Sequence, residues 1–125
     1  MFDIRKLAPQ ETAFMQLCDI EGTPQFGDDG SAPGIEFYGP GTRESRAAET
    51  AYFAKLKKLE DTKRGNDIEE VLKAKREYVT RVTKRLVGFE FDGGPAALYQ
   101  DDEYQHIFRQ ADKYVGDQGN FKKSS

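Results

Sequence analysis

Few residues in this chain have the chemistry of a catalytic site. The 125 residues include one histidine, His106, and one cysteine, Cys18. A hydrolase or transferase needs a nucleophile, a base and a group that orients them. His106 falls on the polar face of a predicted helix, which favours a solvated side chain, and Cys18 lies among apolar residues, which favours a packed one. The sequence therefore predicts a protein that is not an enzyme and has no catalytic residue.

Motifs for metals and cofactors are also missing from the sequence. It contains no pair of Cys or His residues at the spacing of metal ligands. The Asp28-Asp29-Gly30 run lacks the alternating oxygen ligands and the terminal Glu of a calcium loop, so we interpret it as a turn. The glycines of residues 39–41 and 93–94 are not followed by the Lys-Ser/Thr of a phosphate loop. We therefore expect no metal and no cofactor.

The net charge of −3 conceals an uneven distribution. Residues 1–42 carry a charge of −5, residues 43–86 a charge of +5 and residues 87–125 a charge of −3. The basic middle segment can neutralise the acidic ends on folding, or it can face an acidic partner. Because the chain as a whole is acidic, it lacks the uncompensated positive charge that nucleic-acid binding requires, and no nucleic-acid partner is expected.

The sequence also bears on where the protein acts. A lone cysteine forms no internal disulfide and is compatible with a reducing compartment. Residues 1–6 lack the long apolar core of a signal peptide, and no apolar run approaches the ~20 residues that span a bilayer. These features predict a cytoplasmic protein with no membrane segment.

Short apolar runs and turn residues predict β-structure near the start of the chain. Residues 12–20 and residues 35–38 have the length and composition of two strands, which would pair as a hairpin. Residues 21–34 between them are rich in glycine, proline and aspartate, which indicates a long mobile loop. A helix is expected from there to about Asp61, with Thr42 or Ser45 as its N-cap.

Helical patterns dominate the rest of the chain. Gly65 is expected to end the first helix in the left-handed conformation, and Asn66 is expected to cap a second helix that runs from Asp67 to about Leu86. A third short strand is predicted near residues 87–91, followed by a short helix at residues 96–100 and a last helix from Asp101 or Asp102 to about Val115. Residues 118–125 are predicted to form a flexible tail. These elements predict one α+β domain over residues 1–125, in which an N-terminal β-hairpin packs with three main helices.

The order of these elements and a motif near the end of the chain resemble the small tail assembly chaperones of long-tailed phages and prophages. The second helix is followed by Gly88-Phe89, where those proteins usually have Gly-Trp. The motif then continues with an aromatic residue, an acidic residue, a glutamine and a final Asp-x-x-Asn-Phe. Here its members are Tyr99, Asp101, Gln110, Asp117, Asn120 and Phe121.

The resemblance implies a non-catalytic protein that binds the tape measure protein and helps the tail tube protein to assemble around it. Such a chaperone acts in the cytoplasm of the bacterial host and is absent from the finished virion. Two alternatives stay open. One is a structural virion component, such as a tail completion or connector protein, and the other is a regulator that binds nucleic acid through the basic helices.

Five residues are the candidates for partner binding: Phe53, Lys75, Tyr99, Asn120 and Phe121. Phe53 lies off the main apolar stripe of its helix and Phe121 lies beyond the last helix, although packing within the chain is the alternative for both. Lys75 interrupts an apolar stripe. Its stem can lie along that surface while its ammonium reaches water or a carboxylate, or its charge can face a partner. Tyr99 and Asn120 are chosen from the motif that carries the resemblance.

Overall fold

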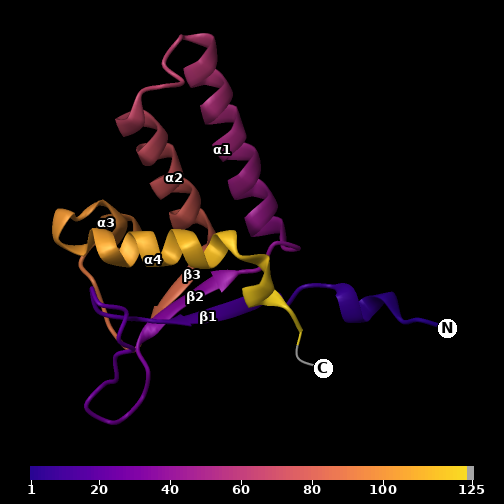
Figure 1. The fold of residues 1–125 in the computed structure, drawn as a ribbon, viewed down its shortest axis with the longest axis vertical. Coiled ribbons are helices and arrows are strands. Elements are labelled where there is room, and N and C mark those ends of the chain that lie inside the picture. The colour runs from indigo at the N-terminus through magenta and orange to yellow at the C-terminus, as the bar shows by residue number, and fades with distance from the viewer. Residues whose placement is uncertain (124–125) are drawn as a thin grey trace.

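The computed structural model describes residues 1–123 and has an α+β fold, as predicted (Figure 1). Three strands form one sheet, two long helices project from it as a hairpin, and a further helix lies across one face of the sheet. In chain order the elements are η1 (Ile4–Leu7), β1 (Thr12–Gln16), β2 (Gly34–Tyr38), α1 (Arg43–Asp61), α2 (Ile68–Val82), β3 (Thr83–Val87), α3 (Gly94–Gln100), η2 (Asp102–Tyr104), α4 (Gln105–Gly116) and η3 (Gln118–Phe121).

The sheet is antiparallel with the order β1-β2-β3. Ala13 of β1 pairs with Phe37 of β2, and Met15 pairs with Ile35. Because side chains alternate along a strand, these four residues share one face of the sheet, and all four are buried. The predicted hairpin is therefore present, although its first strand ends at Gln16 and not near residue 20, and Cys18 makes only an isolated bridge to Pro24.

The third strand is earlier in the chain than residues 87–91, where the sequence predicts it. Helix α2 ends at Val82, and residues 83–87 pair with β2, so that Leu86 lies opposite Ile35. Leu86 lies at the helical spacing of the apolar residues of α2, which explains why the sequence predicted a helix as far as Leu86. The β-branched pair Val82 and Thr83 tolerates the extended backbone, and pairing with β2 supplies the hydrogen bonds that a longer helix would have supplied.

Helices α1 and α2 pack against each other and project away from the sheet (Figure 1). The Thr42 hydroxyl accepts a hydrogen bond from the Ser45 backbone N–H at 3.2 Å, which confirms Thr42 as one of the two predicted N-caps of α1. The N-cap of α2 is Asp67, not Asn66, because its carboxylate accepts from the Glu70 N–H. Lys63, with φ of 60°, takes the left-handed turn position that was expected at Gly65.

Helix α4 and the turn after it cover the buried face of the sheet. Tyr114 stacks on Phe37, with 5.7 Å between ring centroids, and meets the edge of Phe121 at 6.0 Å. Phe121 is only 2% exposed, and its carbonyl accepts a hydrogen bond from the Gln10 N–H at 2.7 Å. The prediction of a flexible tail is therefore wrong for residues 118–121, which fold back as η3 because an apolar ring has a site in the core; residues 124–125 of that prediction lie outside the described residues.

Tyr99 of α3 is fully buried in the same core. Its ring lies near Phe108 of α4, with 6.1 Å between centroids, and its hydroxyl lies 2.7 Å from the Thr83 hydroxyl at the start of β3. Burial raises the pKa of the Tyr99 hydroxyl to about 12, and the hydrogen bond with Thr83 opposes this shift. The residue therefore fixes α3 to the sheet and does not face a partner.

The raised pKa of Tyr99 predicts a loss of stability at high pH. An unfolded tyrosine has a pKa near 10, so the folded protein holds this proton more tightly than the unfolded chain does. The contribution to the free energy of unfolding is complete below pH 10 and is lost as the pH rises from about 10 to about 12, by up to about 2–3 kcal/mol. In denaturant titrations across this range, the free energy of unfolding of wild type should fall relative to that of Tyr99→Phe. A constant difference between the two proteins would contradict the prediction.

Candidate partner-binding surface

Residues of the C-terminal motif form hydrogen bonds with the backbone on either side of α4 and so stabilise this part of the fold. The carboxylate of Asp101 accepts a hydrogen bond from the backbone N–H two residues later, at 2.9 Å, and that of Asp117 does the same at 3.0 Å. The Asn120 amide donates to the Tyr114 carbonyl near the end of α4, at 2.9 Å. Each bond satisfies a backbone group at a helix end. The Asn120 side chain is therefore committed to the fold.

Side chains of α4 also cover the free edge of β1. Gln110 donates to the Gln16 carbonyl at 2.8 Å and accepts from the Cys18 N–H at 3.2 Å, while the Tyr114 hydroxyl donates to the Phe14 carbonyl at 3.0 Å. An open strand edge invites pairing with a strand of another chain. These bonds occupy groups that such a strand would need, so β1 is a poor site for strand addition.

Of the five candidate contact residues, three are not available for a partner. Tyr99 and Phe121 are core residues, and the Asn120 amide is bonded to α4. The burial of Tyr99 and Phe121 does not follow from local sequence, because the apolar partners of the two rings lie on distant segments of the chain. Phe53 and Lys75 remain, and the structure brings these two together on the helical hairpin.

Four residues on the hairpin form a surface cluster, which we call the elbow cluster: Tyr52, Phe53, Lys75 and Tyr78. The Tyr52 ring is at its centre, with ring centroids 5.8 Å from Phe53 and 5.4 Å from Tyr78. The Lys75 ammonium lies 5.1 Å from the centroid of the Tyr52 ring, which is a cation–π distance. Phe53 is 56% exposed at the rim. Tyr52 and Tyr78 are the members of the cluster that are not among the five residues predicted from the sequence.

The elbow cluster faces the far end of α4 across a hollow of about 250 Å³ that is also lined by Asp112 and Val115. Lys75 Nζ lies 3.5 Å from Asp112 Oδ1, so its ammonium reaches a carboxylate while its stem covers apolar surface. Burial raises the pKa of Tyr78, and the nearby carboxylates of Glu49 and Asp112 raise it further. The tyrosine is therefore a neutral hydrogen-bond donor at any physiological pH.

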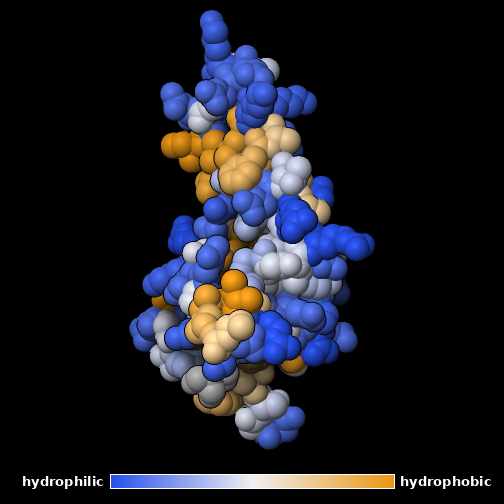
Figure 2. Space-filling view, turned by 90° about the vertical axis from the view of Figure 1, so that its right-hand side faces the viewer, coloured by the Kyte–Doolittle hydropathy of each residue, from blue (hydrophilic) through white to orange (hydrophobic). Residues whose placement is uncertain are grey.

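The space-filling view shows that apolar atoms are concentrated in two places on one side of the molecule (Figure 2). One patch lies over the helical hairpin, and the other lies lower, over the N-terminal segment that points towards the viewer. Among the large exposed apolar side chains, Met1, Phe2, Ile4 and Leu7 belong to the N-terminal segment, and Phe53 and Ile68 belong to the helical hairpin. Contiguous apolar surface of this kind is typical of protein–protein interaction sites.

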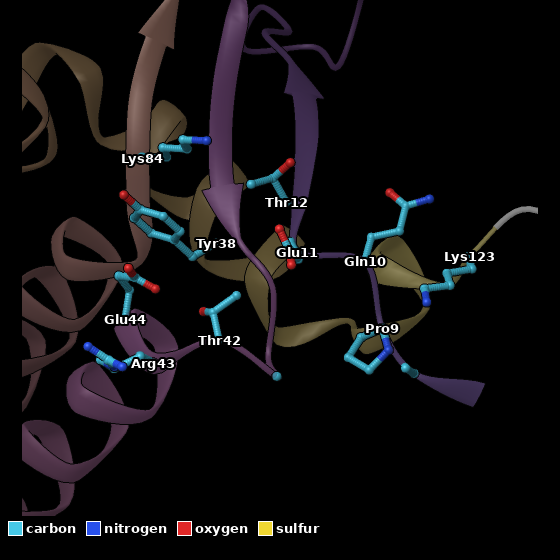
Figure 3. A pocket seen from close by; sticks show the side chains of 12 residues that line it. Pro9, Gln10, Glu11, Thr12, Tyr38, Thr42, Arg43, Glu44, Lys84 and Lys123 are labelled. Carbon is cyan, nitrogen blue, oxygen red and sulfur yellow. The ribbon is translucent and has the colours of Figure 1, made fainter. Parts of the chain in front are cut away.

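A second hollow lies where the ends of β1 and β2 meet the start of α1 (Figure 3). Its charged side chains include Glu11, Arg43, Glu44 and Lys84, and they are spread around the rim with both signs mixed. A binding site for a small ligand needs polar groups that converge on one point. This arrangement does not provide them, and we assign it no ligand.

The described residues contain no other group that suggests chemistry. His106 is half-buried beside the Tyr104 ring, and within residues 1–123 no three His, Cys, Asp or Glu side chains come together as they would around a metal ion. None of the described helices is long and apolar enough to cross a membrane. Comparisons with family models, curated proteins and solved structures find no match to this chain.

Proposed function

We propose that this protein is a tail assembly chaperone that binds a helical segment of the tape measure protein through the elbow cluster, without catalysis. The resemblance of the C-terminal motif to phage chaperones supports the class of protein. The elbow cluster supports the mode of binding, because it places aromatic rings beside the hollow between the hairpin and α4, with Phe53 more than half exposed. In this role the protein acts in the host cytoplasm and leaves before the virion is complete.

One observation carries the proposal: Phe53 is 56% exposed although its neighbour Tyr52 holds it in an aromatic cluster. An amphipathic helix binds a groove by inserting apolar side chains at i, i+3 or i+4 positions. The hollow between the hairpin and α4 accepts such a side chain next to Phe53 and Tyr52. The Lys75–Asp112 pair offers both signs of charge to polar residues at the edge of the bound helix.

The charge of the hairpin fits a partner that would otherwise aggregate. Residues 43–82 carry eleven basic and eight acidic side chains, which give a charge of +3. A strongly charged pair of helices with one apolar face can shield an apolar helix while it keeps the complex in solution. This is what a chaperone of a long helical protein has to do before the tail tube encloses that protein.

The test is capture of the tape measure protein by variants of the elbow cluster. The tape measure protein of the same phage is co-expressed with tagged wild type or Phe53→Asp. Loss of an apolar anchor and burial of a charge should reduce capture at least about tenfold. Phe26→Asp is the matched control, because Phe26 is an exposed aromatic residue of the 21–34 loop, far from the hairpin in the sequence, and is 67% exposed.

Two results would contradict the proposal. One is undiminished capture by a Phe53→Asp protein whose thermal unfolding matches that of wild type. The other is the presence of this chain at stoichiometric amounts in purified virions, which would favour a tail completion or connector protein. The position of the gene gives an independent check, since a chaperone gene is expected between the tail tube gene and the long tape measure gene.

A further inference from the structure

The hollow between the helical hairpin and α4, which we call the elbow hollow, already holds one positive charge of the chain itself. The Lys75 ammonium lies 5.1 Å from the centroid of the Tyr52 ring and 5.7 Å from that of the Tyr78 ring. It also lies 3.5 Å from the Asp112 carboxylate. Aromatic faces attract cations, so two rings and a carboxylate around one ammonium are the surroundings that a basic group requires. The structure thus shows which sign of charge the elbow hollow stabilises.

The Lys75 ammonium does not balance all the negative charge of the elbow hollow. Glu49 lines the same hollow, and its carboxylate forms no ion pair within residues 1–123. Burial raises the pKa of the Tyr78 hydroxyl, and the charges of Glu49 and Asp112 raise it further, so both carboxylates act on the hollow. Two carboxylates therefore face one cation there.

The end of α4 adds to this negative potential. Val115 and Gly116, the last two residues of the helix, also line the elbow hollow. The C-terminal end of a helix carries a partial negative charge, because its last carbonyl groups lack partners within the helix. Lys113, the basic residue of the last turn, is not part of the lining. The helix end thus favours a further positive charge in the hollow.

The elbow hollow has room for a side chain from outside, and its two ends differ in chemistry. Its volume is about 250 Å³ with the Lys75 side chain in place. Glu49 and Phe53 are four residues apart on α1, so they are neighbours on one face of that helix. A partner helix that lies along α1 has the same spacing between its own residues i and i+4. If one of them is apolar and packs against Phe53, the other lies close to Glu49.

We propose that the elbow hollow binds a basic side chain of the partner helix, with its head group at the Glu49 carboxylate and its stem against the Tyr52 ring. This inference rests on the function proposed above. It specifies what the partner presents, which is a lysine or arginine three or four positions from an apolar residue. The Lys75 ammonium competes with this side chain for the rings and for Asp112. A helix that presents only an apolar side chain leaves Lys75 in place and binds less tightly.

Nuclear magnetic resonance titration of the full chain with designed peptides tests the proposal. The probe is an alanine-rich helical peptide with one leucine and an arginine four residues later. Matched peptides have glutamine or glutamate in place of the arginine. Backbone amide signals of residues 49–53 and 112–116, which include the lining of the hollow, should shift on binding. The arginine peptide should bind at least about fivefold more tightly than the glutamine peptide, and the glutamate peptide should bind least tightly.

Variants of the protein identify the groups that recognise the arginine. Glu49→Gln should remove most of the difference between the arginine and glutamine peptides. Glu60→Gln is the matched control and should keep the difference, because Glu60 is an exposed residue of the same helix that does not line the hollow. Lys75→Met keeps an apolar stem and removes the competing ammonium. It should bind the arginine peptide at least about threefold more tightly than wild type does.

Four results would overturn the proposal. They are no saturable binding of the arginine peptide, equal affinity for the arginine and glutamine peptides, equal effects of Glu49→Gln and Glu60→Gln, and no tighter binding by Lys75→Met. The titration contains no tape measure protein, so its failure leaves the capture test of Phe53→Asp unaffected. Selective binding of the arginine peptide together with a failed capture test would keep the site and reject the tape measure protein as its partner.

Discussion

Phe121→Ala is expected to lower the free energy of unfolding by about 3–4 kcal/mol. The phenylalanine is 2% exposed and packs against the edge of Tyr114, which in turn stacks on Phe37 in the middle of the sheet. Its removal leaves a cavity between the C-terminal turn and β1, and the turn itself loses its apolar anchor. The hydrogen bond from the Gln10 N–H to the Phe121 carbonyl is then expected to fray.

Denaturant titration of wild type and Phe121→Ala measures this loss. The matched control is Phe26→Ala, which removes the same ring from a site that is 67% exposed and should change the free energy of unfolding by less than about 0.5 kcal/mol. A similar small effect in both variants would mean that the tail is not part of the core. It would restore the hypothesis that Phe121 contacts a partner.

Phe108→Ala is expected to cost about 3 kcal/mol for a related reason. Phe108 is 4% exposed on the inner face of α4, where it lies close to the Tyr99 ring. The Arg76 guanidinium of α2 lies 5.5 Å from the centroid of the Phe108 ring, so the same side chain also supports the base of the hairpin. The variant should loosen the junction of α2, α3 and α4 as well as open a cavity.

A substitution that conserves the apolar volume distinguishes the loss of packing from the loss of the contact between the Phe108 ring and the Arg76 guanidinium. Phe108→Leu keeps most of the apolar volume and should cost less than about 1.5 kcal/mol. If denaturant titration gave a value near zero for Phe108→Ala, the apolar stripe of α4 would not be core. If the Leu variant lost as much as the Ala variant, the contact with the Arg76 guanidinium would matter more than the cavity.

The burial of Phe121 changes how the C-terminal motif is understood. Tyr99 and Phe121 fill the core, Gln110 covers the edge of β1, and Asn120 holds the end of α4. Each of these roles is structural, so the motif describes how such a domain closes around its last helix. A partner has to use other surfaces, and the exposed apolar residues of the hairpin and the N-terminal segment are the strongest candidates.

Local rules predicted the elements that depend on neighbouring residues. The Thr42 cap and the extent of α1 follow from one hydroxyl and a helical period, and the apolar face of α4 follows from its own spacing. The same rules failed at Leu86, because an apolar residue at helical spacing is also acceptable in a strand. Only β2, almost fifty residues earlier in the chain, decides that residues 83–87 are extended.

By itself the sequence determined the α+β class, the helical hairpin with its charged surface, and the lack of catalytic motifs, since composition and local periodicity suffice for these. The tertiary structure decided which aromatic rings are available to a partner. Phe53 and Phe121 are both off the main stripe of a helix, yet one is exposed and the other is buried. The difference arises because η3 folds back next to Gln10, more than a hundred residues earlier, whereas Phe53 lies at the rim of the hollow between the hairpin and α4 and stays 56% exposed.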